Sequence, residues 1–268
     1  MIDCLSRYGM EQNPFLKNSR DILLDSSESS EVSTRLSFLA DTKGIGILTG
    51  GPGMGKTTAA RIWKDSLSPA LFKTSYNCLS TLTVMDFYRQ MAYSLGIEPR
   101  FRKNDIFNDI QSEIRRLAIE KRVTPVIIID EADMLGHKVL SDLQLLFNFQ
   151  MDSRDPAIIL LIGQPRLNII LSQGMHEPLL QRIVMNYNMG GLTKDEGHSY
   201  ITRKLEGVGC HQKVFEDNAA EAVLNAANGI PRMINKICNR ALMIGASRNL
   251  NIIDADIVMK AVDDIQLG

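Results

Sequence analysis

The chain has 268 residues, a length that predicts a main domain with a smaller appended one. Hydrophobic residues make up 44% and charged residues 23%, which is ordinary for globular proteins and excludes a disordered chain or a coiled-coil rod. Lysine and arginine total 30 against 31 aspartate and glutamate, so no charge excess indicates nucleic-acid binding, and any DNA contact must come from a local patch.

The first two-thirds of the chain alternates predicted helices with predicted strands. The serine-rich run at 25–33 is either a loop or the cap of a helix in which Val32, Leu36 and Leu39 recur at helical spacing. Strands are predicted at 44–50, near 71–76, at 126–130, at 157–163 and at roughly 184–189. Helices are predicted at about 56–67, 82–95, 104–121 and around 140–147. Because the most apolar strands lack alternation, they predict an α/β fold with a mainly parallel five-stranded sheet between layers of helices.

Beyond Thr193 the strand patterns stop and four helices are predicted. They cover about 194–206, 215–227, 231–247 and 254–264. We therefore place a domain boundary near Leu192. The predicted organisation is an N-terminal segment over 1–43, an α/β core over 44–191 and a helical lid domain over 192–268.

The cysteines and the apolar runs predict an ordinary intracellular protein. The four cysteines, at 4, 78, 210 and 238, form no CxxC pair, so reduced thiols are expected rather than disulfides or zinc ligands. The N-terminus has no basic segment leading into an apolar stretch, and no apolar run is long enough to cross a bilayer. A cytoplasmic location without a membrane partner is the expectation.

The strongest indication of chemistry is a glycine-rich loop between a predicted strand and a predicted helix. Its eight residues match the phosphate-loop pattern and are Gly50, Gly51, Pro52, Gly53, Met54, Gly55, Lys56 and Thr57. Glycines let the backbone bend closely so that several N–H groups point at a polyphosphate. We expect Lys56 to neutralise the β- and γ-phosphate oxygens of ATP and Thr57 to bind Mg²⁺, with Thr58 as a weaker candidate. The alternative, a glycine-rich turn that ends in Lys-Thr by chance, is disfavoured by the flanking strand and helix.

Two carboxylates follow the apolar strand at 126–129. Open α/β sheets hold their ligands at the carboxyl ends of the strands, which is where Asp130 and Glu131 stand. We expect Asp130 to hold Mg²⁺ and Glu131 to orient and polarise the water that attacks the γ-phosphorus. Acidic residues that end a strand also commonly cap the next helix, and this is the alternative interpretation.

A polar amide, Gln164, ends the strand at 157–163 and is predicted to hold the attacking water. Such a glutamine is otherwise an ordinary loop residue. The Asn-Lys-x-Asp motif that reads guanine is absent, because Asn235-Lys236 continues as Ile-Cys. Adenine is therefore the expected base.

With these motifs in place, the sequence resembles the AAA+ ATPases, and more narrowly the ATPase module of the ExeA type. Matching segments include Tyr8-Gly9-Met10 with Asn13-Pro14-Phe15, then DEADML at 130–135, LLFNF at 145–149, LIGQPRL at 161–167 and GIPRMINKICNRAL at 229–242. The resemblance covers almost the whole chain. It implies that the segment 1–43 packs on the nucleotide site.

The resemblance also implies roles for two arginines. Arg182, just before the last predicted strand, matches the arginine that reaches the γ-phosphate of a neighbouring subunit in AAA+ proteins. Arg232, after Pro231 at the start of a lid helix, matches the arginine that senses nucleotide in its own subunit. The alternative for both is an ordinary surface salt bridge.

Full-length ExeA-type proteins carry a membrane span and a cell-wall-binding region after the ATPase module, and this sequence ends at Gly268 with neither. The chain is similar instead to the helper ATPases of DNA transposition, of the IstB, MuB and TnsC kind. That resemblance implies a homo-oligomer, a ring or a helical filament, that binds double-stranded DNA with ATP and recruits a transposase. The alternatives are a protein-directed module of the secretion or assembly type and a helicase loader.

The residues that would contact DNA are the least defined part of the sequence. Arg100, Arg102 and Lys103 form the densest basic cluster, with Phe101 among them, between two predicted helices. Related initiator-type AAA+ proteins place DNA-contacting insertions there, and phosphate neutralisation requires such charges. A solvated loop is the alternative.

Overall fold

The computed structural model describes residues 4–17, 26–78, 83–149 and 155–266. They group into two compact units, each considered by itself. The sheet unit comprises Glu31–Pro52 and Lys56–Met189, and the helical unit comprises the residues up to Ser30, Gly53–Gly55 and Gly190–Gly268. The predicted boundary near Leu192 thus falls close to the division after Met189. In the part of the chain that the structure describes, no helix is both long and apolar enough to span a membrane.

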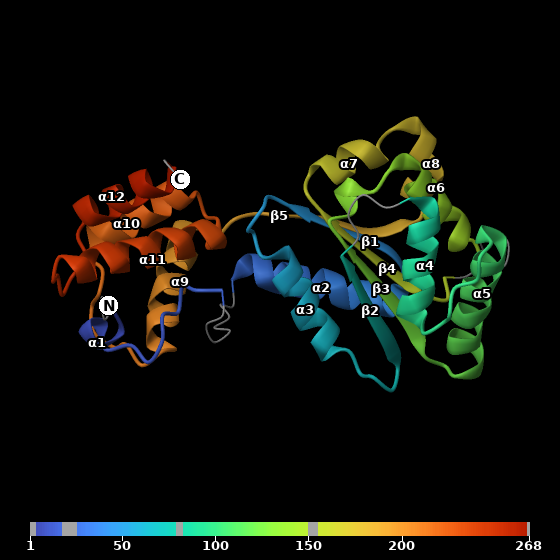
Figure 1. Ribbon diagram of the computed structural model, residues 1–268, viewed down its shortest axis with the longest axis horizontal. Helices are drawn as coiled ribbons and strands as arrows, with labels where there is room; N and C mark the ends of the chain where they lie inside the picture. Colours follow the sequence, from blue (N-terminus) through green and yellow to red (C-terminus); the bar gives the residue numbers. More distant parts are fainter. Residues whose placement is uncertain (1–3, 18–25, 79–82, 150–154, 267–268) are drawn as a thin grey trace. The chain divides into compact units, whose positions relative to one another are not determined.

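In the ranges that the structure describes, the sheet unit is built on five parallel strands (Figure 1), which confirms the predicted fold class. They are β1 (Gly44–Gly50), β2 (Phe72–Cys78), β3 (Thr124–Asp130), β4 (Ile158–Gly163) and β5 (Ile183–Met189). Their order is β2-β3-β4-β1-β5, so β2 and β5 form the edges. Strands β1, β3 and β4 are buried along their whole length, because helices cover both faces of the sheet.

Two apolar layers join the sheet to its helices, which lie on both of its faces in Figure 1. On one face lie α2 (Ser27–Thr42), which crosses the division at Ser30, and α3 (Lys56–Ser66). On the other face lie α4 (Val84–Leu95), α5 (Lys103–Arg115), α6 (His137–Leu146), α7 (Arg166–Leu171) and α8 (Glu177–Leu180). The serine-rich run caps α2, since the Ser26 hydroxyl accepts a hydrogen bond from the backbone N–H of Ser29 at 3.1 Å.

The strand register brings the chemically interesting strand ends together. Thr49 of β1 pairs with Gly163 of β4, so the glycine-rich loop leaves the sheet beside the residue that precedes Gln164. Cys78 of β2 pairs with Asp130 of β3, and β3 also pairs with β4. The carboxyl ends of four strands therefore meet at one edge, where ligands of open α/β sheets bind.

Among its described residues, the helical unit contains four longer helices and a short N-terminal one. They are α1 (Cys4–Tyr8), α9 (Lys194–Glu206), α10 (Asp217–Ala227), α11 (Pro231–Ser247) and α12 (Ala255–Gln266). The start of α9 is fixed by a reciprocal cap between Thr193 and Glu196. Tyr8, Met10 and Phe15 belong to the core of this unit. The predicted 1–43 segment is therefore divided, its first part packing with the helical unit and residues from Glu31 onward with the sheet unit. Contact of this segment with nucleotide stays a prediction.

Candidate active site

The glycine-rich loop connects β1 to α3, as the motif predicts. Gly53 and Gly55 have φ angles of 83° and 102°, in the left-handed region that side chains other than glycine rarely adopt. The Lys56 ammonium donates hydrogen bonds to the carbonyl oxygens of Gly50 and Gly51, both at 2.9 Å. A cation is thus held at the mouth of the loop, next to the N-terminus of an 11-residue helix.

Asp130, at the end of β3, is 4% exposed, and its carboxylate accepts hydrogen bonds from Thr57, Tyr76 and Glu131. Its Oδ2 accepts from the Thr57 hydroxyl at 2.8 Å and from the Tyr76 hydroxyl at 2.7 Å. Its Oδ1 accepts from the backbone N–H of Glu131 at 2.9 Å. These donors compensate for the loss of hydration around a buried charge. The structure therefore brings together the two residues predicted to hold Mg²⁺.

Tyr76 is a component of this site that the sequence interpretation missed. It lies two residues before Cys78 on β2, so its side chain stands on the same sheet face as Asp130 in the neighbouring strand. Burial and the neighbouring Asp130 carboxylate raise the pKa of its phenol well above the ordinary value of 10.0. The phenol therefore keeps its proton at neutral pH and donates a hydrogen bond to Asp130.

Glu131 has an unusual backbone conformation, with φ 56° and ψ 36° in the left-handed region. This conformation costs a residue other than glycine about 1 to 2 kcal/mol. Non-glycine outliers of this kind concentrate at functional sites, where the surrounding structure holds them. The exposed side chain of Glu131 follows Asp130 directly and is accessible to solvent.

Gln164 is anchored by a second acidic residue that the sequence interpretation did not single out. Asp133, in the short 3₁₀ helix Ala132–Met134, is 3% exposed, and its Oδ1 accepts from the Gln164 backbone N–H at 3.0 Å. Gly163 must lack a side chain here, because a Cβ would lie 2.9 Å from the same oxygen. The Arg166 guanidinium donates to the Asp133 carbonyl oxygen at 2.8 Å. The Gln164 side chain itself is exposed.

Arg182 lies directly before β5, as predicted. Its Nη1 donates to the carbonyl oxygen of Gln144 in α6 at 3.0 Å, and the side chain is half-buried. Within a single subunit, the Arg182 guanidinium is therefore already hydrogen-bonded to the backbone of α6. The trans role implied by the resemblance stays a prediction.

Arg232 lies in the first turn of α11, after Pro231 at the helix start. Its side chain is exposed, and within the helical unit its backbone N–H donates to the carbonyl oxygen of Gly53 at 3.3 Å. Its role as a nucleotide sensor stays a prediction.

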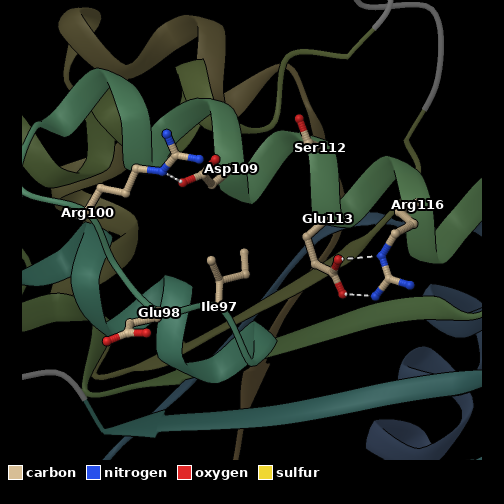
Figure 2. Close-up of a pocket in the computed structure, with 7 residues that line it drawn as sticks. All are labelled: Ile97, Glu98, Arg100, Asp109, Ser112, Glu113 and Arg116. Atoms are coloured by element: carbon tan, nitrogen blue, oxygen red, sulfur yellow. Dashed lines mark hydrogen bonds and ion pairs between the residues drawn. The ribbon is translucent and has the colours of Figure 1, made fainter.

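The basic cluster proposed for DNA is partly compensated by carboxylates. Figure 2 shows Arg100 directed at Asp109, with its Nε 2.9 Å from Oδ2, beside a hollow of about 330 Å³. Lys103 Nζ lies 2.5 Å from Asp142 Oδ1. Arg102 is exposed, and the ring of Phe101 is 94% exposed. The hollow is lined by Ile97, Glu98, Arg100, Asp109, Ser112, Glu113 and Arg116.

The donors in the sheet unit fit a magnesium-bound nucleoside triphosphate. The hydroxyl of Thr57 and the carboxylate of Asp130 are hard oxygens, the ligands that Mg²⁺ prefers, and they already lie within hydrogen-bond distance of each other. Lys56 and the start of α3 supply positive charge for phosphate oxygens. When bound, the metal would neutralise the charge of the β- and γ-phosphates.

Comparisons with known proteins indicate the family to which the sheet unit is similar. Residues 39–171 match the AAA domain family. The chain is 31% identical over 262 residues to General secretion pathway protein A of Aeromonas hydrophila. This alignment covers 96% of this chain and 47% of that protein. Over 126 residues it is 32% identical to ATP-dependent target DNA activator B of Escherichia phage Mu, which covers 43% of this chain and 35% of that protein.

The chain thus spans less than half the length of these two relatives. Its fold is similar to the solved structure of the Aeropyrum pernix ORC2 protein in ADPNP–ADP complexes, with a TM-score of 0.64 and 16% sequence identity. That match covers 94% of this chain and 71% of the other. The fold is thus that of an AAA+ P-loop NTPase, as the motifs predict, and the match of residues 39–171 to the AAA domain family is consistent with ATP hydrolysis.

Proposed function

We propose that this chain is a magnesium-dependent ATPase that binds double-stranded DNA as an ATP-dependent oligomer and acts as a helper in DNA transposition. The observation that carries the proposal is its 32% identity to ATP-dependent target DNA activator B of Escherichia phage Mu. In this proposal ATP assembles subunits on target DNA, the assembly recruits or activates a transposase, and hydrolysis disassembles it. The compartment is the cytoplasm.

Each residue of the site has its own role in ATP hydrolysis. Lys56 moves from the loop carbonyls to the phosphate oxygens of ATP and neutralises their charge. Thr57 and Asp130 hold Mg²⁺. Glu131 orients a water in line with the γ-phosphorus, with Gln164 as its second partner, so that the water oxygen bonds to phosphorus as the bond to ADP breaks.

Two arginines would link this chemistry to assembly. Arg182 of one subunit stabilises the charge on the γ-phosphate of its neighbour, so turnover depends on oligomerisation. Arg232 senses the nucleotide in its own subunit. These two roles rest on the family resemblance.

The decisive experiment measures ATP turnover and filter binding of duplex DNA at several salt concentrations. We expect DNA to raise turnover and to bind only with ATP, with affinity that falls as salt rises because basic residues displace counterions from phosphates. Lys56→Ala serves as a control that cannot bind nucleotide. Absence of ATP-dependent DNA binding at low salt refutes the proposal.

A matched pair of variants tests the basic cluster as the DNA contact. Asp109→Asn removes the carboxylate partner of Arg100, whereas Asp41→Asn makes the same charge change at an exposed site on α2. Because an exposed ion pair contributes about 0.2 to 1 kcal/mol, freeing Arg100 should raise DNA affinity by at most about fivefold. Equal effects of the two variants would exclude Arg100 as a contact.

A second candidate is a protein-directed module of the secretion type. The alignment with General secretion pathway protein A favours it, because that match extends over 96% of the chain. In this case DNA leaves turnover unchanged and a protein partner stimulates it. A helicase loader, by contrast, would prefer single-stranded DNA.

A further inference from the structure

We infer that Tyr76 is a positioning residue for the metal site, acting through the carboxylate of Asp130. The inference rests on the proposed Mg²⁺ site at Thr57 and Asp130. The supporting observation is a 2.7 Å hydrogen bond from the Tyr76 hydroxyl to Oδ2 of Asp130. The hydroxyl of Thr57 donates to the same oxygen at 2.8 Å.

Strand pairing explains how a tyrosine on an edge strand reaches this carboxylate. Tyr76 pairs with Ile128 and Cys78 with Asp130, so Tyr76 and Asp130 are diagonal neighbours on one sheet face. Adjacent strands lie about 4.8 Å apart and rise about 3.3 Å per residue, so diagonal neighbours are about 8 Å apart, a span that a long aromatic side chain can bridge. The contact is thus set by the register of β2 on β3.

The three groups that donate hydrogen bonds to Asp130 have different roles in the proposed metal site. The Thr57 hydroxyl oxygen is itself a predicted metal ligand, and the Glu131 N–H belongs to a backbone in the left-handed region. Tyr76 contributes a donor from a separate strand and has no predicted role of its own in binding nucleotide. Because Asp130 is 4% exposed, its carboxylate depends on such donors to be held in one orientation.

Packing alone does not account for the placement of Tyr76. Its side chain is 48% exposed, so the ring contributes little to the core. Replacement by phenylalanine keeps the ring and removes only the hydroxyl. Tyr93 offers a matched control, because it is 64% exposed on α4 and belongs to the same unit.

The test titrates Mg²⁺ into wild type, Tyr76→Phe and Tyr93→Phe in the presence of ATP carrying a fluorescent ribose label. Removing a hydrogen-bond partner of a metal ligand weakens metal affinity by about 10- to 100-fold. Tyr76→Phe should therefore need a Mg²⁺ concentration about 10- to 100-fold higher than wild type for half-maximal binding of the labelled ATP. Affinity for the labelled ATP in EDTA, and the melting temperature, should match those of Tyr93→Phe. ATP turnover by Tyr76→Phe should recover as Mg²⁺ is raised.

Three outcomes overturn the inference. The first is a Mg²⁺ midpoint of Tyr76→Phe that equals the wild-type value, and the second is an equal shift in Tyr93→Phe. In both cases the metal site itself stands, because wild-type binding still responds to Mg²⁺. The third is a wild-type protein whose nucleotide affinity ignores Mg²⁺, which removes the proposed metal site together with the role of Tyr76.

Discussion

Replacing Phe15 by alanine tests whether the N-terminal Asn-Pro-Phe motif is a structural part of the helical unit. Phe15 is 5% exposed in that core. Its neighbours are tied down as well, since Asn13 Nδ2 donates to Asn239 Oδ1 at 2.8 Å and Lys204 Nζ donates to the Pro14 carbonyl oxygen at 3.2 Å. A buried phenylalanine truncated to alanine loses about 3 to 5 kcal/mol of stability. The adjacent Leu16 is 52% exposed, so Leu16→Ala should cost less than about 1 kcal/mol.

Urea unfolding followed by two probes separates the units. The single tryptophan, Trp63, lies in α3 of the sheet unit, so its fluorescence reports that unit, whereas far-UV circular dichroism reports both. Phe15→Ala should lower the midpoint of the dichroism transition and move the fluorescence transition less. Equal midpoints for Phe15→Ala and Leu16→Ala would refute the reasoning. Weakened ATP binding by folded Phe15→Ala would in turn support the predicted packing of this segment on the nucleotide site.

Three further variants probe hydrolysis, assembly and acid stability. Glu131→Gln should lose about 10² to 10⁴ in turnover yet keep ATP bound, because it removes the group that polarises the water, and light scattering should detect a trapped assembly. Arg182→Ala should slow hydrolysis by about 10³ to 10⁵, and mixing it with Glu131→Gln should restore turnover if the arginine acts in trans. Normal hydrolysis by Arg182→Ala alone would exclude that role. Backbone N–H groups of Thr193 and Ser27 hold the pKa of Glu196 at about 2, below its ordinary 4.5. Since the folded pKa is depressed, its stabilisation is present above pH 4.5 and is lost as pH falls toward 2. Acid unfolding of Glu196→Gln should therefore depend less on pH over that window, and an unchanged pH dependence would contradict the assignment.

The phosphate loop and the acidic pair were predictable because their chemistry is local in sequence. Glycines at 53 and 55 are required by backbone angles within the loop itself, and Asp130 is the last residue of its strand. The short helices α7 and α8 were not predicted, since six and four residues are too few to establish a helical period. The strand predicted near 71–76 continues to Cys78, and that extension is what pairs β2 with Asp130.

The residues that contact the predicted site residues could not be predicted, because their positions depend on which strands are neighbours. The order of the strands in the sheet cannot be inferred from any single segment of the sequence. Tyr76 becomes part of the site only because β2 lies beside β3, and Asp133 only because the turn after β3 reaches the end of β4. The same reasoning applies to the surface. Arg100 and Lys103 stand together in a basic run, yet the fold pairs each with an acid, Arg100 with Asp109 in the following helix α5 and Lys103 with the more distant Asp142 in α6. The number of basic residues in a sequence run therefore overestimates the positive charge available to bind phosphate. Basic side chains that pair with carboxylates in the folded protein must be left out of that number.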